Sequence, residues 1–396
     1  MDTRPSFADL LARYRSLLLE VIVPFWEPHL DGEYGGILNC LADDGTRISE
    51  DKFIWSQARA LYIYAKLYNA IAPRQEWLEA ARSIYRFLLA HGRDRTGHWV
   101  WRTDRRGHVL EGYQSLYAEG FALYGLAEYY RATGDEEARA VGLETYHRVV
   151  EQLAVPGSYP LAPYAIPAGM KCHGVSMIFS LVFWEFGRAI GDRAIEEDGY
   201  CHTLEVLNHY LRPERQALLE FIGLDNRPQD TPAGRTVVPG HAIESLWFQM
   251  HVLESRGEHE RIPAAAEAIR WHLERGWDPE FGGLFLGLDV DGVEPPYWAH
   301  PTVKTWWQHT EALYATLLAY AHTREDWCLE WYWRVHDWAF AHYPDPVHGE
   351  WRQRLDRAGR PLEEVVALPV KDPFHLPRAV IYIIQVLERL AAGTGG

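Results

Sequence analysis

The chain has 396 residues, with 39 Lys and Arg against 55 Asp and Glu, so its formal net charge at pH 7 is −16. This acidic balance argues against a nucleic-acid partner, because such a surface needs clustered basic charge. At 47% hydrophobic residues the chain can bury a large core, which excludes a disordered protein. It has no basic-then-apolar start and no apolar run of about 18 residues, so we expect a cytoplasmic protein with no membrane partner. Its cysteines, at positions 40, 172, 201 and 328, lack disulfide-scaffold or zinc spacing, which favours a reducing compartment.

A short loop pattern recurs along the chain. Each copy has an acidic or turn residue, then Gly, then a few apolar residues and a second turn, which is typical of a β-hairpin. Clear copies begin at Asp31, Asp94, Asp278 and Asp345, and weaker copies lie near Gly157 and Pro213. These six loops predict six structural units. We assign Asp278 and Asp345 to the turns rather than to chemistry.

Two kinds of helical segment alternate between these loops. One kind is apolar on nearly all faces, so these helices should be buried on most sides. Its members start at Trp55, Leu116, His173, Gly240, Trp306 and Phe374. The other kind is amphipathic and carries a charged face. Its members span residues 10–26, 76–92, 136–153, 195–211, 264–277 and 326–343.

Six buried helices that alternate with six half-exposed ones predict an all-α fold. The expected architecture is an (α/α)6 barrel, with six inner helices inside a ring of six outer helices and the β-hairpin loops at one end. An open solenoid is the alternative, but polar capping repeats are not evident at either end of the chain. We therefore expect one barrel domain over residues 1–396.

Polar side chains concentrate in the first turns of the buried helices, and beyond those turns the helices become apolar. The set includes Gln57, Arg59, Glu119, His173, Ser176, His241, Glu244, His309, Glu311, His375 and Arg378. A single histidine of this kind is more often a hydrogen-bonded core residue than a ligand. The whole set at one repeat position, however, predicts a site at one mouth of the barrel.

Two residues of this set have specific expected partners. His241 and Glu244 are neighbours on one helical face, so the carboxylate can hold the imidazole tautomer and favour its protonated form. The alternative is that Glu244 completes a helix cap. Arg59 lies in an otherwise apolar helix, where an unpaired cation would be costly, so it should meet a carboxylate or a substrate oxygen.

Aromatic residues are abundant, with 17 Trp, 22 Tyr and 14 Phe. Such faces suit carbohydrate sites, although large helical cores use them too. The run from Lys304 to His309 places two adjacent indoles, Trp306 and Trp307, beside a histidine. One indole is expected to line the cavity as a platform for a sugar ring; the alternative is that both pack between helices.

Common metal and nucleotide motifs are missing from the sequence. There is no HExxH, no Walker-type glycine loop, no GxSxG elbow and no DxDxDG calcium loop. We therefore expect no cofactor and no metal, and a site that works by acid–base chemistry of histidines and carboxylates.

Six segments taken together carry a family resemblance. They are WSQARALYIYAKLY, PGHAIESLWF, WDPEFGGLF, KTWWQHTEALYA, GEWRQRLDRAG and PFHLPR. In this order, from about Pro24 to Leu390, they resemble the N-acylglucosamine 2-epimerase family, which implies an (α/α)6 barrel of sugar epimerases and isomerases.

The resemblance also implies roles for individual residues. His241 and His375 would be the acid–base pair, Arg59 would contact sugar oxygens, and Glu244 would support His241. The other residues expected to bind substrate are Lys304, Trp307, His173, His309, Glu311, Glu119 and Arg378.

Two departures bear on the branch of the family. Cellobiose epimerases and mannose isomerases resemble each other in carrying a second histidine where this chain has Val175. The WW-x-His-x-Glu run and the FHLPR segment of this chain are more similar to the N-acetylglucosamine branch. The Gly-rich stretch of that branch before the last histidine is replaced by LPVKDPF, so activation by a nucleotide is not implied.

The reaction implied is inversion at C2 of an aldose or N-acylhexosamine, of the N-acetylglucosamine and N-acetylmannosamine type. Two histidines would remove and return the C2 proton through an enediolate, because imidazole serves as acid or base near neutral pH. An aldose–ketose isomerase would use the same pair. A glycoside hydrolase, which needs two flanking carboxylates, and a non-enzymatic protein-binding scaffold are further alternatives. The expected partner is a small-molecule sugar, and a homodimer is left open.

Overall fold

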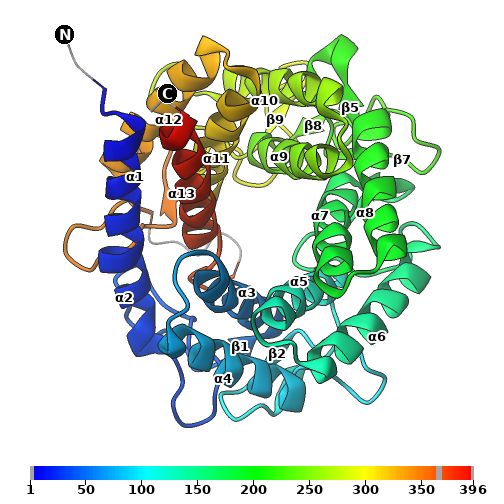
Figure 1. Cartoon of the computed structure of the whole chain (residues 1–396). Coiled ribbons are helices and arrows are strands. Elements are labelled where there is room, and N and C mark those ends of the chain that lie inside the picture. Colours follow the sequence, from blue (N-terminus) through cyan, green and yellow to red (C-terminus); the bar gives the residue numbers. More distant parts are fainter. Residues whose placement is uncertain (1–3, 363–367, 394–396) are drawn as a thin grey trace.

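The computed structural model describes residues 4–362 and 368–393. Within this part of the chain, six helices form an inner ring, and Figure 1 shows them arranged in sequence order around one axis. They are α3 (Ile54–Ala70), α5 (Leu116–Thr133), α7 (His173–Ile190), α9 (Pro239–Arg256), α11 (Trp306–Thr323) and α13 (His375–Gly393). Each packs against the next, and α13 packs against α3, which closes the ring.

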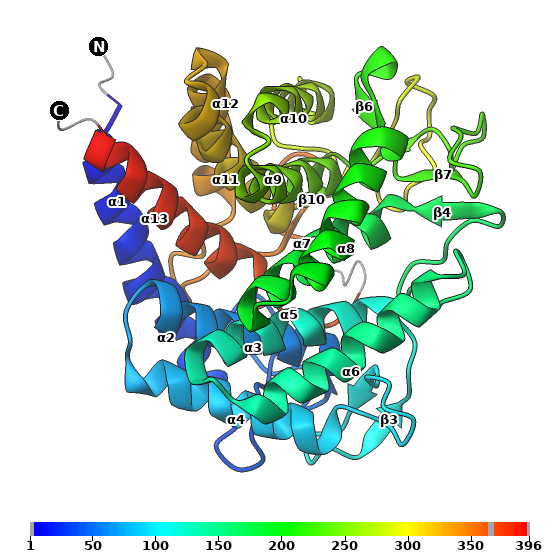
Figure 2. The ribbon, with the colours of Figure 1, turned by 45° about the vertical axis from the view of Figure 1, so that its right-hand side comes forward.

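An outer ring surrounds these helices. It consists of α4 (Gln75–His91), α6 (Glu136–Leu153), α8 (Arg193–Glu205), α10 (Ile262–Gly276), α12 (Asp326–His342) and the N-terminal α1 (Phe7–Ser16), which continues through a π-helical turn (Leu17–Ile22) into α2 (Val23–Trp26). The outer helices α4, α6, α8, α10 and α12 each pack on the inner helix that precedes them, whereas α1 packs on α13. Figure 2 shows α1 and α13 side by side. The predicted (α/α)6 barrel is confirmed.

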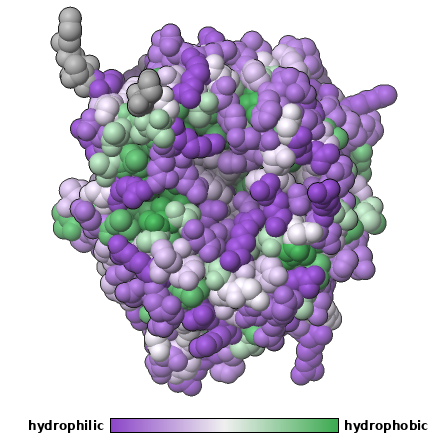
Figure 3. All heavy atoms as spheres, in the orientation of Figure 1, coloured by the Kyte–Doolittle hydropathy of each residue, from purple (hydrophilic) through white to green (hydrophobic). Residues whose placement is uncertain are grey.

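Sequence features explain the packing of the two rings. The inner helices are apolar on all sides, and α7 is buried from His173 to Gly187. Helices α3 and α5 approach closely at Gly125, where a Cβ atom would lie 2.6 Å from the Ala58 carbonyl oxygen. The outer helices bury one face, and the surface in Figure 3 is accordingly mostly hydrophilic, with small scattered apolar groups.

Inner and outer helices connect through short turns with recognisable end signals. Helix α5 ends at Gly134 in the left-handed conformation, with φ of 66°. Asp135 follows at once, and its side chain accepts the backbone N–H groups of Glu137 and Ala138 at the start of α6. No helix in the described part of the chain is long and apolar enough to cross a membrane.

Short antiparallel strands fix the end of the barrel at which the inner helices begin. Strands β1 (Lys52–Phe53), β4 (Met170–Cys172), β8 (Thr236–Val237) and β10 (Lys304–Thr305) lead into α3, α7, α9 and α11. They pair with β2 (Arg102–Thr103), β7 (Phe221–Gly223), β9 (Leu288–Asp289) and β11 (Arg354–Leu355). Each partner strand follows the next outer helix, so every pair joins two neighbouring units. Strand β3 (Val109–Glu111) extends the first of these sheets.

Five of the six predicted hairpin loops are confirmed within the described residues. Four are closed by the bridges Leu30–Ile37, Arg93–Trp99, Trp277–Leu284 and Pro344–Trp351, and the fifth by β5 (Leu211–Arg212) and β6 (Ala217–Leu218). Near Gly157 the prediction is wrong, because Leu161 bridges to Ser115 instead. Asp278 and Asp345 each accept backbone N–H groups two and three residues ahead, as expected of turn residues.

Candidate active site

A cavity of about 280 Å³ lies at the end of the barrel where the inner helices begin. Each inner helix contributes a residue of its first turn to the wall: Trp55, Tyr117, Gly174, His241, Trp307 and His375. Loop residues from 161–166, 298, 353–354 and 368–372 complete the wall. The cavity therefore lies at the mouth of the barrel where the site was expected.

His241, in the first turn of α9, is held by a carboxylate that the sequence did not suggest. Its Nδ1 donates to Glu220 Oε2 at 3.2 Å, and Glu220 lies between β6 and β7. A carboxylate only accepts, so Nδ1 carries a proton and Nε2 is the nitrogen available for chemistry. Burial alone would lower the pKa of His241, but the charge of Glu220, its hydrogen bond and the charge of Glu244 together raise it. Burial would likewise raise the pKa of Glu220, which His241 and His173 instead hold far below its usual value.

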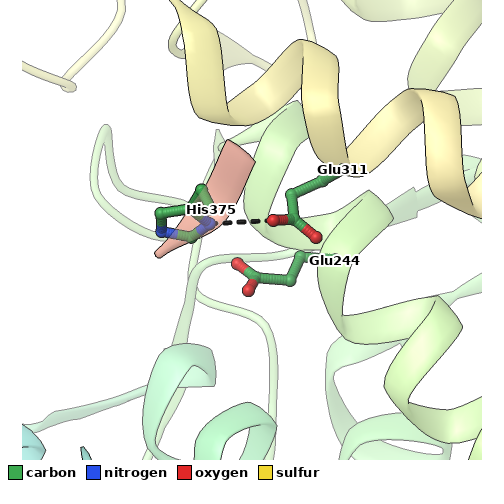
Figure 4. A group of neighbouring side chains, drawn as sticks. All are labelled: Glu244, Glu311 and His375. Carbon is green, nitrogen blue, oxygen red and sulfur yellow. Dashed lines mark hydrogen bonds and ion pairs between the residues drawn. The ribbon is translucent and has the colours of Figure 1, made fainter. Parts of the chain in front are cut away.

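His375, the first residue of α13, has a matching arrangement. Its Nδ1 donates to Glu311 Oε1 at 2.8 Å, and its backbone N–H donates to Asp372 at 2.9 Å. In Figure 4 the other ring nitrogen of His375 points away from both Glu311 and Glu244. Both histidines thus use Nδ1 for a carboxylate, and neither Nε2 has a hydrogen-bond partner among the described residues.

Behind His375, three side chains form a buried charge network. Ligand atoms of Glu244, Glu311 and His375 lie within 4.8 Å of one another, a spacing that could hold a metal ion. The guanidinium of Arg378, however, pairs with Glu244 and, at 2.7 Å, with Glu311. Burial would raise the pKa of Glu311, but the charge of Arg378 holds it low. Arg378 therefore supplies the positive charge that a metal would bring.

Arg59 reaches the cavity from α3 and meets a carboxylate, as expected. Its Nη1 lies 3.0 Å from Asp372 Oδ1, so Asp372 links Arg59 to the start of α13. The guanidinium also lies over the ring of Phe121, 4.0 Å from the ring centroid. Such contacts fix the cation in place with one edge toward the cavity.

Trp307 contacts both histidines. Its ring centroid is 5.2 Å from that of His241 and 5.6 Å from that of His375. Trp306 also lines the cavity, so both indoles of the pair do so, where the sequence predicted one. A flat ring beside two histidines can support one face of a sugar.

Six of the residues expected to bind substrate do not line the cavity, namely Glu119, His173, Lys304, His309, Glu311 and Arg378, and this corrects the prediction. Glu119 accepts the backbone N–H of Trp99, and His309 Nε2 accepts that of Leu284. Each thus anchors the residue that follows a hairpin turn, and burial lowers the pKa of His309 to about 3. Lys304 is fully buried and pairs with Asp278 at 3.2 Å.

The fourth position of the inner helix explains this error. Gln57, Glu119 and His309 occupy it in α3, α5 and α11, and all three bind hairpin backbone. A buried backbone N–H beside a tight turn needs an acceptor, so a polar residue recurs there for structural reasons. The polar residues that recur at the start of the inner helices therefore include some that anchor hairpin loops and some that line the cavity. The sequence pattern alone does not separate the two kinds.

The remaining expected residues stand at or behind the cavity wall. Glu244 lines the cavity but pairs with Arg378, so the expected support of His241 by Glu244 is replaced by Glu220. His173 is fully buried behind the wall, 3.7 Å from Glu220. A lone acidic residue within the apolar run from Ala217 to Ile222 was the signal that could have identified Glu220.

Residues 35–158 and 198–379 match the family described as N-acylglucosamine 2-epimerase (GlcNAc 2-epimerase). The N-acylglucosamine 2-epimerase of Bos taurus is 30% identical over 98% of this chain and 93% of its own length. A cellobiose 2-epimerase of Bacteroides fragilis is 34% identical over 83% of this chain and 87% of its own. The structure of a cellobiose 2-epimerase from Spirochaeta thermophila superposes with a TM-score of 0.83 at 23% identity, covering 99% of this chain and 100% of that one.

Proposed function

The chain belongs to the N-acylglucosamine 2-epimerase family, and from that membership we propose that it is a carbohydrate epimerase, an isomerase that inverts C2 of an N-acylated hexosamine. By the extent of the match, the chain lies nearer the N-acylglucosamine 2-epimerases than the cellobiose 2-epimerases. This supports a substrate of the N-acetylglucosamine and N-acetylmannosamine type. The free cysteines suit a reducing compartment, so the proposed location is the cytoplasm.

The observation that carries the proposal is the pair of carboxylate-supported histidines that both contact Trp307. An open-chain sugar resting on the indole would present one face of C2 to His241 and the other to His375. A neutral histidine takes the C2 proton through Nε2, the electron pair of the C–H bond forms a double bond between C1 and C2, and the π pair of the carbonyl group moves to its oxygen to give an enolate. The other histidine, which is protonated from the start, then gives its proton to the opposite face of C2.

The surroundings of the two histidines differ in charge. The only cationic partners of Glu220 among the described residues are His241 and His173, and it also accepts from Cys172 Sγ, whereas Glu311 is shared between His375 and Arg378. The raised pKa of His241 suits the role of acid, and we assign His375 the role of the base that begins the reaction. The reverse reaction exchanges these roles.

Arg59 supplies positive charge for the enolate oxygen. Its guanidinium is already fixed by Asp372 and Phe121, so it need not reorganise as charge develops. The reaction needs no metal or cofactor in this scheme, because Arg59 and the two histidines cover charge stabilisation and proton transfer.

The test runs the reaction in heavy water and measures by NMR how much deuterium enters the sugar at C2. With one histidine on each face, each exchanging its own proton with solvent, N-acetylmannosamine and N-acetylglucosamine should interconvert and acquire deuterium at C2 in nearly every turnover. Mannose, glucose and cellobiose serve as comparison substrates. A ketose product that keeps unexchanged hydrogen at C1 would overturn the epimerase proposal in favour of an isomerase.

A further inference from the structure

The cavity wall carries polar atoms that the proposed reaction does not use. The side chain of Gln353 is buried, with the residue 1% exposed, and both its Nε2 and its Oε1 lack hydrogen-bond partners among the described residues. The indole Nε1 atoms of Trp306 and Trp55 are likewise buried without a partner, and all three residues line the cavity. An unsatisfied buried polar atom is destabilising, so these atoms indicate where a polar ligand binds.

Gln353 is held close to the reacting centre. Its backbone carbonyl accepts the N–H of Trp306 at 3.4 Å, and its backbone N–H donates to Asp43 at 3.2 Å. The ring of Trp306 meets that of His375 edge-on, with centroids 6.3 Å apart. Gln353 therefore lies on the His375 side of the cavity, next to Trp306.

The unsatisfied atoms also indicate what kind of group binds there. Trp55 Nε1, Trp306 Nε1 and Gln353 Nε2 are donors, against one acceptor, Gln353 Oε1. A carbonyl oxygen offers two acceptor positions and no proton, so it suits a site in which donors outnumber acceptors. The reacting carbon of the proposed substrate carries such an oxygen in its acylamino group, whereas a 2-hydroxy sugar has none at that distance from C2.

We propose that Gln353 is a specificity-determining residue that recognises the acyl oxygen at C2, an inference that rests on the proposed function. Gln353 Nε2 donates to the acyl oxygen, Trp306 Nε1 donates to the same oxygen, and Gln353 Oε1 accepts from a neighbouring hydroxyl group of the sugar. Loss of the Nε2 donor thus weakens binding of an N-acylated sugar selectively, because a 2-hydroxy sugar makes only the hydroxyl contact.

The test uses two alditols that bind but lack the carbonyl group needed for reaction. N-acetylglucosaminitol and sorbitol differ only at C2, and calorimetry gives the Kd of each for the full-length protein. Gln353→Glu keeps the shape and the acceptor but replaces the donor. This variant should raise the Kd of N-acetylglucosaminitol by about 10- to 100-fold and that of sorbitol by less than about twofold. The reason is that one hydrogen bond is lost and a carboxylate meets the acyl oxygen.

Two further variants keep the test decisive. Gln353→Met removes both amide atoms without adding charge, and it should weaken N-acetylglucosaminitol more than sorbitol by about 5- to 10-fold. Gln249→Met is the matched control, because Gln249 is equally buried but bonds to Ser180 and Ser245 outside the cavity. It should leave both Kd values unchanged.

The outcomes separate this inference from the proposed function. Equal weakening of both alditols by Gln353→Met, or a Kd for N-acetylglucosaminitol within about twofold of wild type in Gln353→Glu, overturns the role of Gln353. If the unmodified protein epimerises no sugar in heavy water, the proposed function itself fails. If the unmodified protein epimerises N-acetylmannosamine but the Gln353 variants change the Kd of both alditols equally, only the role proposed for Gln353 fails.

Discussion

The pairing of His241 with Glu220 leads to a prediction about pH dependence. We expect E220Q to move the alkaline limb of the kcat/KM profile to lower pH. The active form of the histidine pair carries one proton, and activity is lost as pH rises through the pKa at which that proton leaves. Burial lowers the pKa of His241, whereas Glu220 and, less strongly, the charge of Glu244 raise it, so the pKa falls when the charge of Glu220 is removed.

The size of the shift follows from the geometry. Nδ1 of His241 and Oε2 of Glu220 are 3.2 Å apart, and both side chains are largely removed from solvent. A carboxylate at this range typically raises an imidazole pKa by about 1 to 3 units. The alkaline limb should therefore fall by about 1 to 3 pH units in E220Q, whereas the amide oxygen of the new side chain can still accept from Nδ1 and preserve the ring orientation.

The assay is the initial rate of epimerisation of N-acetylmannosamine across the pH range. Glu119→Gln is the matched control, because Glu119 is also buried and also accepts from a histidine, His98 Nδ1 at 2.9 Å, but lies outside the cavity. Its profile should keep the wild-type limbs. An alkaline limb unchanged in E220Q, or shifted equally by both variants, would refute the assignment of His241 as the histidine that holds the proton.

Further predictions concern the other charged groups. His241→Asn and His375→Asn should each lower turnover by at least about 100-fold with circular dichroism unchanged, and near-normal turnover would show that the histidine is not catalytic. Arg378→Met should lower the free energy of unfolding by about 3 to 5 kcal/mol, because Glu244 and Glu311 would be buried without a counter-charge; unchanged denaturant unfolding would contradict that charge network. Exhaustive chelation should leave turnover unchanged, and a loss restored by adding metal would contradict the metal-free mechanism.

The barrel could be predicted from the sequence because its signals are local. Apolar and amphipathic helices alternate, and each pair lies between turn residues that stop one element and start the next. Gly134 and Asp135, for instance, end α5 and begin α6 through their own backbone and side-chain preferences. Six such units in order leave few ways to bury the apolar helices other than a closed ring.

Part of the site could also be predicted from local pattern. His241, His375, Arg59 and Trp307 were all expected at the cavity, and all four line it. These residues occupy the first two turns of inner helices, so the closed ring alone is enough to bring them to one mouth.

The partners of these residues were decided by the tertiary structure. Glu220 reaches His241 from a loop 21 residues away, and Glu311 reaches His375 across 64 residues. Glu119 and His309, polar and helical like the true site residues, face the hairpins because a buried backbone N–H there needs an acceptor. Helical period determines which residues are buried, but the direction in which a buried polar side chain points depends on which loops and neighbouring helices supply its hydrogen-bond partners. That choice is made only when the ring closes.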